Sequence, residues 1–357
     1  MSFSYFSYTV PLLNRIERRW PATTHACTPS LLSPPNSHHC PHVQKPEAAR
    51  NRNLSIMPTK DLIYELLHYF NVRELLPIAA INIFHTKIIR KHLQQRFTLM
   101  ASRFFPDTKA FLQILSDYDA TVSGSAALHL LLPMKTTNWT PNDLDIYAPS
   151  VHRVAMCAKM LTLGYFIVAN LENEQTPYTS SLIHQVLTFS NTVHNIHVIF
   201  STTHTAFTPI FQFHSTLVMN FVSPKHIFCA YPDLTFQHLS LINPAPLYFE
   251  QFNIATADAL RKYNDRGFCY VNCTTMGTCT TNVRSLTDNR CFWLDLNQIS
   301  HLTSSASQIM TAYHATDVVW VLGGRICGIP SNDSFVFPRI ELIENEPYVS
   351  SFRLSSD

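Results

Sequence analysis

Two short motifs in the first half of the chain carry side chains whose types and spacing suit one kind of chemistry. Gly124 and Ser125 open a predicted helix, and the free N–H groups of a helix start suit a phosphate, as does the serine hydroxyl. Asp143 and Asp145 are separated by one residue in a predicted strand, so both carboxylates leave the same face. Neighbouring carboxylates supply the hard oxygen ligands that Mg²⁺ requires. Together the motifs predict a site for a metal ion that carries a polyphosphate.

Each motif also has an ordinary structural explanation. Ser125 could serve only to cap a helix that follows a turn. The Asp-x-Asp pattern occurs a second time, at Asp117 and Asp119, where we predict a solvated turn. The scarcity of glycine favours a functional interpretation of Gly124. The chain has 7 glycines and none precedes Gly124, so this one is expected where the backbone needs a positive φ or a ligand comes close.

The elements that position these residues follow from the hydrophobic pattern. From Phe111 onward, segments with the period of a strand alternate with segments of helical period, which predicts an α+β fold with a mixed sheet and flanking helices. The predicted helices in this part are 123–132, 151–163 and 254–263. The predicted strands are 143–147, 165–169, 184–189, 196–200 and 317–322, of which the third and fourth form a hairpin.

The order of these motifs resembles the nucleotidyltransferase superfamily, in which a Gly-Ser helix is followed by an Asp-x-Asp strand and then by a third acid on a neighbouring strand. The resemblance covers residues 110–240. It implies that Asp143 and Asp145 bind Mg²⁺ and act in catalysis, and that Gly124 and Ser125 contact the nucleotide. An active protein of this kind would transfer a nucleotidyl group from a nucleoside triphosphate to an acceptor hydroxyl.

Basic residues further along the chain are candidates for contacts with the phosphates. Lys225 is the nucleotide-binding candidate, and Arg261, Lys262 and Arg266 are further basic candidates. The last three lie near a predicted helix end closed by Gly267, where positive charge also satisfies the helix dipole.

The place of the third acid is taken by His197. A neutral imidazole cannot supply the same negative charge to a two-metal site or serve equally as a base. Two interpretations follow: one metal remains, with His197 as an unusual ligand or catalytic base, or transfer activity has been lost and binding remains. We favour loss or reassignment. The loop 133–141 also makes the gap between the motifs longer than usual.

The segment before this core has helical periodicity, with predicted helices at 62–70, 75–83 and 86–100. From Pro58 it reads Pro-x-x-x-Leu-Ile-x-Glu-Leu-Leu-x-x-Phe-x-Val-x-Glu-Leu-Leu, which resembles an F-box. This resemblance implies a substrate adaptor that docks onto the scaffold of a cullin ubiquitin ligase. A helical bundle that caps the next domain would look the same, so both interpretations stay open.

A set of fungal proteins that joins such a start to a Gly-Ser-x-Ala-Leu and Trp-x-Pro-x-Asp-Leu-Asp-Ile-Tyr core is also similar; Trp139 and Pro141 fit it.

The predicted organisation is a disordered leader (1–56), an F-box-like helical unit (57–104), a nucleotidyltransferase-like domain (105–244) and a C-terminal mixed α/β extension (245–357). The leading hypothesis is a nucleotidyltransferase-fold protein that binds a metal-nucleotide, with transfer activity open. The alternative is an F-box-type adaptor whose second domain recognises a protein. A third hypothesis combines the two: an adaptor whose second domain is an enzyme fold that has lost its activity.

Composition limits the partners and the compartment. The formal net charge of +2 is too small to indicate a nucleic-acid footprint, and no apolar run reaches the length of about 18 residues that a membrane span needs. The 9 cysteines, an odd number without a secretory signal, fit reduced thiols in a cytoplasmic or nuclear protein. The basic, serine-containing start leaves a mitochondrial presequence open.

Overall fold

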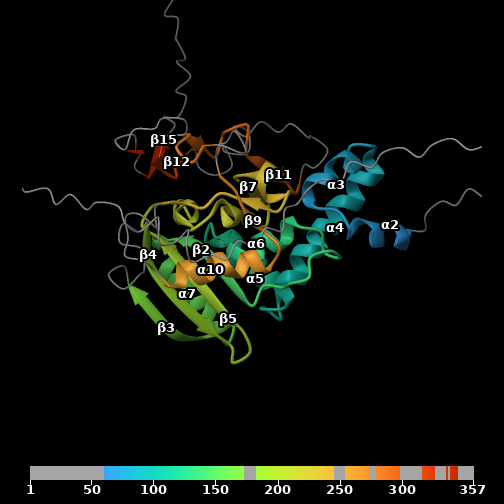
Figure 1. The fold of residues 1–357 in the computed structure, drawn as a ribbon. Helices are drawn as coiled ribbons and strands as arrows, with labels where there is room; N and C mark the ends of the chain where they lie inside the picture. Colours follow the sequence, from blue (N-terminus) through green and yellow to red (C-terminus); the bar gives the residue numbers. More distant parts are fainter. Residues whose placement is uncertain are drawn as a thin grey trace, which may run out of the picture. The chain divides into compact units, whose positions relative to one another are not determined.

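A mixed β-sheet, whose strands direct successive side chains to opposite faces, forms the centre of the fold. The computed structural model describes residues 60–172, 182–244, 254–272, 279–297, 316–325, 335–336 and 338–344. In these ranges the largest sheet has 8 strands, in the spatial order β11 (Phe292–Asp295), β7 (His226–Cys229), β6 (Asn220–Val222), β1 (Thr121–Ser123), β2 (Asp143–Pro149), β5 (Asn195–Ser201), β4 (Ile183–Ser190) and β3 (Phe166–Glu172). β2 and β5 run parallel and the other neighbours antiparallel (Figure 1). The fold is therefore α+β with a mixed sheet, as predicted.

The parallel pair of β2 and β5 depends on the long connection between them. Parallel neighbours cannot be joined by a tight turn, and here the chain passes through the 3₁₀ turn η1 (Ser150–His152), helix α7 (Arg153–Thr162), β3 and β4. β4 and β5 form the predicted hairpin, in which Ser190 pairs with Asn195. The hairpin thus brings β5 back beside β2.

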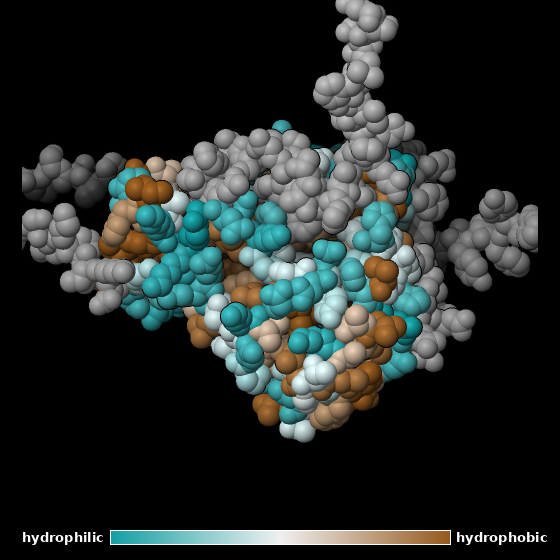
Figure 2. Space-filling model, turned by 180° about the vertical axis from the view of Figure 1, so that it is seen from behind, coloured by the Kyte–Doolittle hydropathy of each residue, from teal (hydrophilic) through white to brown (hydrophobic). Residues whose placement is uncertain are grey.

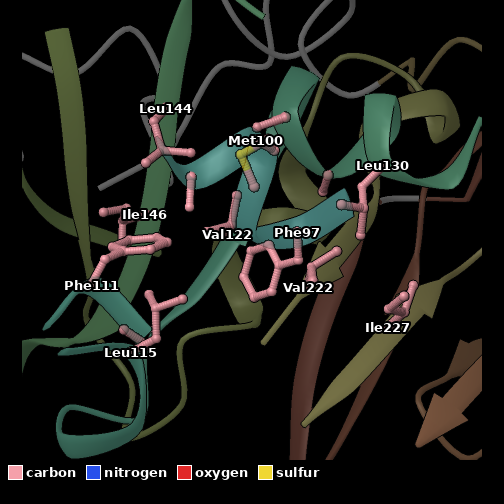
Figure 3. Close-up of a cluster of buried hydrophobic side chains, with 14 of the residues drawn as sticks. Phe97, Met100, Phe111, Leu115, Val122, Leu130, Leu144, Ile146, Val222 and Ile227 are labelled. Carbon is pink, nitrogen blue, oxygen red and sulfur yellow. The ribbon is translucent and has the colours of Figure 1, made fainter. Parts of the chain in front are cut away.

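Two hydrophobic cores lie on opposite faces of the sheet. Successive side chains of a strand point to opposite faces, and accordingly Leu144 and Ile146 of β2 belong to the first core while Tyr147 belongs to the second. Figure 3 shows the first core, where side chains of helices α4 (Ile83–Ser102) and α5 (Thr108–Asp117) converge on those of the strands. The odd-numbered positions of β2 therefore share their face with the second core.

Helices α2 (Lys60–Leu67) and α3 (Val72–Ala79) precede α4 along the chain. α3 begins with a capping box, since the Asn71 side chain accepts from the Glu74 N–H and the Glu74 carboxylate accepts from the Asn71 N–H. The third helix was predicted to start at Thr86 but begins earlier. The reason is Asn82, whose side-chain oxygen accepts a hydrogen bond from the His85 N–H at 3.0 Å and so caps the helix.

The helical segment 60–102 shares its core with the sheet. Leu75 of α3 and Phe97 of α4 belong to the same buried cluster as Val122 of β1 and Ile227 of β7. All described residues belong to one compact unit. The helices therefore pack as part of the same body as the strands. The predicted disordered leader, 1–56, lies outside the described residues.

Elements of the predicted C-terminal extension also pack against this body. β11 pairs with β7, which extends the large sheet. Tyr263 of helix α10 (Ile254–Asp265) is buried beside Leu128 of helix α6 (Gly124–Leu131). The predicted strand 317–322 is β12 (Thr316–Val321), which lies between β10 (Arg284–Ser285) and β15 (Arg339–Glu344) in a smaller sheet. The remaining elements are η3 (Thr208–Gln212), η4 (Thr216–Val218), α8 (Pro232–Thr235), β8 (Leu239–Ser240), β9 (Cys269–Tyr270), β13 (Gly324–Arg325) and β14 (Phe335–Val336).

The helical segment from α2 to α4 carries several of the exposed apolar side chains of the described residues. They are Leu62, Leu66, Tyr69, Ile81, Ile83, Phe84 and Leu99. Seen from behind, apolar groups on the surface are interspersed with hydrophilic ones (Figure 2). Of the helices in the described ranges, none combines the length and the apolar character that a membrane span requires.

Buried histidines should make this fold sensitive to acid. Burial lowers the pKa of His92 to about 3 and the pKa values of His129, His214 and His226 to about 4. The unfolded chain titrates near the ordinary value of 6.5, so below that pH protons bind to the unfolded state and not to the folded state. We expect the free energy of unfolding to fall as the pH drops from about 6.5 to about 4, by at most about 1.4 kcal/mol per histidine and pH unit. Urea unfolding at several pH values measures this slope.

His92→Phe is the variant that isolates this effect. The His92 ring is almost fully buried and its Nε2 has no hydrogen-bond partner, so phenylalanine leaves no polar group unsatisfied. The variant should lose less stability between pH 6.5 and pH 4 than the wild type does. Equal losses in both proteins would contradict the assignment.

Candidate metal-binding site

Three adjacent strands place the candidate residues in one row. Ser123 of β1 pairs with Asp145 of β2 in antiparallel register, and Asp145 pairs with His197 of β5 in parallel register. Directly paired residues point to the same face of a sheet. The Asp145 and His197 side chains therefore emerge side by side. Asp143 emerges on the same face two residues earlier along β2.

Asp143, Asp145 and His197 form a group that could hold a metal ion. One ligand atom from each residue lies within 4.8 Å of those of the other two. All three residues are partly buried; the side chains of Asp145 and His197 are 22% and 33% exposed. An ion could therefore reach the group from solvent while the surrounding chain restrains the ligands. The sequence predicted His197 at the position of the third acid, and the structure brings it to the two aspartates.

A hydrogen bond links two members of this group. His197 Nδ1–H donates to Asp145 Oδ1 at 3.0 Å. The hydrogen bond to this carboxylate raises the pKa of His197, burial opposes the rise, and the negative charges of Asp145 and Asp143 add to it. The imidazole is thus oriented by a carboxylate, as metal-binding histidines commonly are.

The absence of a side chain at Gly124 leaves space for the Asp145 carboxylate. The φ of Gly124 is +64°, a left-handed conformation that residues with a side chain rarely adopt. A Cβ at this position would lie 3.3 Å from Asp145 Cγ and overlap Asp145 Oδ2. Gly124 therefore meets two requirements at once, the turn from β1 into α6 and close approach to the aspartate. Both agree with the expectation from glycine scarcity.

The start of helix α6 faces the same group. The Ser125 hydroxyl donates to Asp143 Oδ1 at 3.3 Å, which joins the Gly-Ser motif to the Asp-x-Asp motif. The residue at the N-cap, Ser123, makes no side-chain cap, because its hydroxyl donates to the Asn220 carbonyl instead. The first N–H groups of α6 are therefore left without a side-chain cap, which is the arrangement that favours an anion.

Tyr263 of helix α10 and Trp139 of the loop 133–141 are aromatic residues that the sequence did not assign to the site, whereas Arg266 beside them was already a basic candidate. Burial raises the pKa of the Tyr263 phenol, and the charges of Asp145 and Asp143 raise it further, so this ring lies within electrostatic range of the aspartates. The Arg266 guanidinium stacks 4.1 Å from the centroid of the Trp139 ring and 5.3 Å from that of Tyr263. In the sequence, Tyr263 appears only as the last residue of the predicted helix 254–263. The helical pattern does not show which residues lie beside it in the fold.

Comparison of the chain with protein-family models, with curated proteins and with solved structures gives no match. The chemistry of the site therefore has to be read from its own residues. Two carboxylates and one imidazole can hold a single divalent ion, and the uncapped helix start beside them can hold a phosphate.

Lys225 is not grouped with these residues. Val222 pairs with Val122, so β6 runs from Ser123 toward Thr121 and leaves the sheet at the end opposite to Gly124. Lys225 lies in the turn that follows, where its backbone N–H donates to the Ser223 hydroxyl. In the described chain the structure therefore separates Lys225 from the other predicted nucleotide-binding residues.

Two further aspartates, Asp233 and Asp258, are engaged in ion pairs of their own. Asp233 pairs with Arg73 at 2.6 Å, and Asp258 pairs with Arg261 at 3.3 Å. The second Asp-x-Asp pair is exposed: Asp117 is the last residue of α5, and Asp119 lies in the turn that follows, which agrees with the predicted solvated turn. Among the described residues, the group that could hold a metal ion contains no third carboxylate.

Proposed function

We propose that this protein binds a divalent metal ion together with a nucleoside triphosphate at Asp143, Asp145 and His197. The observation that carries the proposal is the convergence of these three side chains within 4.8 Å beside the uncapped start of α6. A metal ion held by the carboxylates would present its open positions to the phosphates. Gly124 and Ser125 lie where backbone and hydroxyl groups can contact the same phosphates.

The donor set bears on the choice of metal. The sequence led us to expect Mg²⁺, which prefers a shell made of oxygen atoms. An imidazole nitrogen suits Mn²⁺, Zn²⁺ and other first-row transition ions better than Mg²⁺. Because His197 supplies such a nitrogen, we propose that the site binds Mn²⁺ more tightly than Mg²⁺.

The same donor set argues for binding rather than transfer. Nucleotidyl transfer with two metal ions needs carboxylates that bridge both ions and a base for the attacking hydroxyl. Here two carboxylates and an imidazole form the group, and His197 Nδ1 is engaged with Asp145. We therefore propose that the site holds one metal ion and binds the nucleotide but does not catalyse nucleotidyl transfer.

We further propose that positive charge and aromatic surface next to Tyr263 contact the remainder of the nucleotide. The Arg266 guanidinium, which has one buried nitrogen without a hydrogen-bond partner, is stacked between Trp139 and Tyr263. A guanidinium in this setting can pair with phosphate oxygens. This is the second feature that supports a nucleotide rather than a bare ion.

Calorimetric titration of the full chain with ATP tests the proposal. We expect ATP to bind in the presence of Mn²⁺, to bind more weakly with Mg²⁺ and not to bind in excess EDTA, since the phosphates reach the protein through the ion. Binding of equal strength with and without metal would contradict the proposed site. A complete lack of Mn²⁺ and ATP binding would contradict it as well.

A second candidate function rests on a different observation, the exposed apolar side chains of the helical segment. Leu66 of α2 is 49% exposed and Phe84 of α4 is 52% exposed, although their neighbours Leu67 and Thr86 are buried. Where exposed apolar groups adjoin one another, they mark an interaction surface. We propose, as the F-box resemblance implies, that this surface docks onto the scaffold of a cullin ubiquitin ligase.

The variant Leu66→Arg separates this function from folding, because the leucine is half exposed. It should weaken binding to the purified ligase scaffold by about tenfold or more, since it places a charge in an apolar contact. Leu161→Arg on α7, where the leucine is 51% exposed, is the matched control and should bind normally. Equal binding by both variants, or no binding by the wild type, would remove this candidate.

A further inference from the structure

A separate cavity lies between helices α4 and α6 and the loop that leads into β2. Its volume is about 220 Å³. Three basic side chains, Arg96, Arg103 and His129, line it together with Leu99, Met134 and other mainly apolar groups. None of the residues of the metal-binding group is among the lining residues. The cavity is therefore distinct from the metal-binding group.

Arg96 is a buried cation with incomplete hydrogen bonding. It is 3% exposed, and its Nη2 donates to the carbonyls of Leu130 and Leu132 at the end of α6. These carbonyls carry the negative end of the helix dipole, which explains part of the stabilisation of the charge. Nε and Nη1, however, have no partner. Since a buried charge is unfavourable unless it is paired and hydrogen-bonded, the protein alone leaves Arg96 undercompensated.

Arg103 strengthens the positive character of the cavity. The ion pairs in the described part of the chain include neither Arg103 nor Arg96. None of the residues that line the cavity is acidic. The Arg103 guanidinium lies 6.0 Å from the centroid of the Phe104 ring. Two guanidinium groups thus border one cavity without a carboxylate to neutralise them.

His129 is held neutral beside the two arginines. Burial lowers its pKa to about 4, and the positive charges of Arg96 and Arg103 contribute to the shift. Its ring meets the edge of Trp139, with centroids 5.2 Å apart. A neutral imidazole adds a hydrogen-bonding group to the cavity without adding charge at neutral pH. The lining thus offers two cations, one neutral polar ring and an apolar remainder.

We propose that this cavity binds a small organic carboxylate, a molecule with one anionic head and an apolar body. The guanidinium groups match the head, because arginine binds carboxylates in a fork geometry. Leu99, Met134 and the other apolar groups match the body. An apolar cavity of about 150 Å³ admits benzene, so the observed volume suits a ligand larger than inorganic phosphate. This proposal does not rest on the metal-nucleotide site.

Calorimetric titration of the full chain with octanoate tests the proposal, with 1-octanol and inorganic phosphate as the two matched probes. Octanol retains the apolar body and lacks the charge, whereas phosphate retains the charge and lacks the body. Octanoate should bind at least about tenfold more tightly than either probe. Absence of octanoate binding up to millimolar concentration, or octanol binding as tight as that of octanoate, would overturn the proposal.

Variants then locate the ligand. Arg103→Ala should weaken octanoate binding by about tenfold or more, because a charge-assisted hydrogen bond is lost. Thr140→Trp, which places a large ring at the cavity wall, should block octanoate without a change of charge. Arg153→Ala on α7, also a partly buried arginine, is the control and should bind octanoate normally. Normal binding by both cavity variants, with their melting temperatures unchanged, would place the ligand elsewhere and overturn the proposal.

Discussion

The Asp143→Ala/Asp145→Ala protein is expected to lose Mn²⁺ affinity by at least about 100-fold. Removal of an outer-shell partner alone lowers metal affinity by about 10- to 100-fold, and this double change removes two of the three ligand atoms of the group. ATP binding should disappear with the ion, because the proposed contact of the phosphates with Asp143 and Asp145 runs through the metal. Calorimetric titration with Mn²⁺, and then with Mn²⁺ and ATP, measures both effects.

The chain contains a matched control for this experiment. Asp117 and Asp119 have the same spacing as the site pair, but they are exposed at the end of α5. Asp117→Ala/Asp119→Ala changes the net charge by the same amount and should leave Mn²⁺ affinity unchanged. If both double variants lose affinity equally, the metal is attracted by general negative charge, and the site assignment is wrong.

The second large effect is expected from Gly124→Ala, which adds a single carbon. The new Cβ overlaps Asp145 Oδ2, so the carboxylate must leave its place in the metal-binding group. The left-handed backbone adds strain of about 1–2 kcal/mol for a residue with a side chain. We therefore expect loss of Mn²⁺ binding similar to that of the aspartate variants, together with a lower free energy of unfolding in urea.

Gly164→Ala separates these two causes. Gly164 has a φ of +84° and no atom within 4 Å of the position of a Cβ, so alanine there meets backbone strain without a steric overlap. Its free energy of unfolding should fall by about 1–2 kcal/mol, and its affinity for Mn²⁺ should stay at the wild-type level. Wild-type Mn²⁺ affinity in Gly124→Ala would show that the glycine is required for the turn alone.

Local features of the site could be predicted from the sequence because they depend on neighbours along the chain. The helix predicted at 123–132 is α6, and the strand predicted at 143–147 is β2, extended by two residues. Their register against His197 could be anticipated only through the resemblance to a known order of motifs. Periodicity shows which face of a strand is apolar, but it does not show which strand lies beside it.

Residues brought in from distant elements could not be predicted in this way. Tyr263 comes within electrostatic range of the aspartates because α10 packs on α6 through Leu128, a contact between segments that are far apart in sequence. Lys225 is the opposite case: it was a candidate for a phosphate contact, but it lies away from the other candidate residues. The antiparallel register of β6 on β1 carries it to the other end of the strand. Packing between distant helices thus decided the first outcome, and strand direction decided the second.

The row formed by Ser123, Asp145 and His197 limits how this chain can vary during evolution. A single-residue insertion inside β2 or β5 would turn the following side chains to the opposite face and divide the group. Insertions in the turn 191–194, outside the paired row, would leave it intact. Length changes in related genes should therefore accumulate in that turn wherever Asp143, Asp145 and His197 persist, and should enter the strands only in lineages that have lost metal binding.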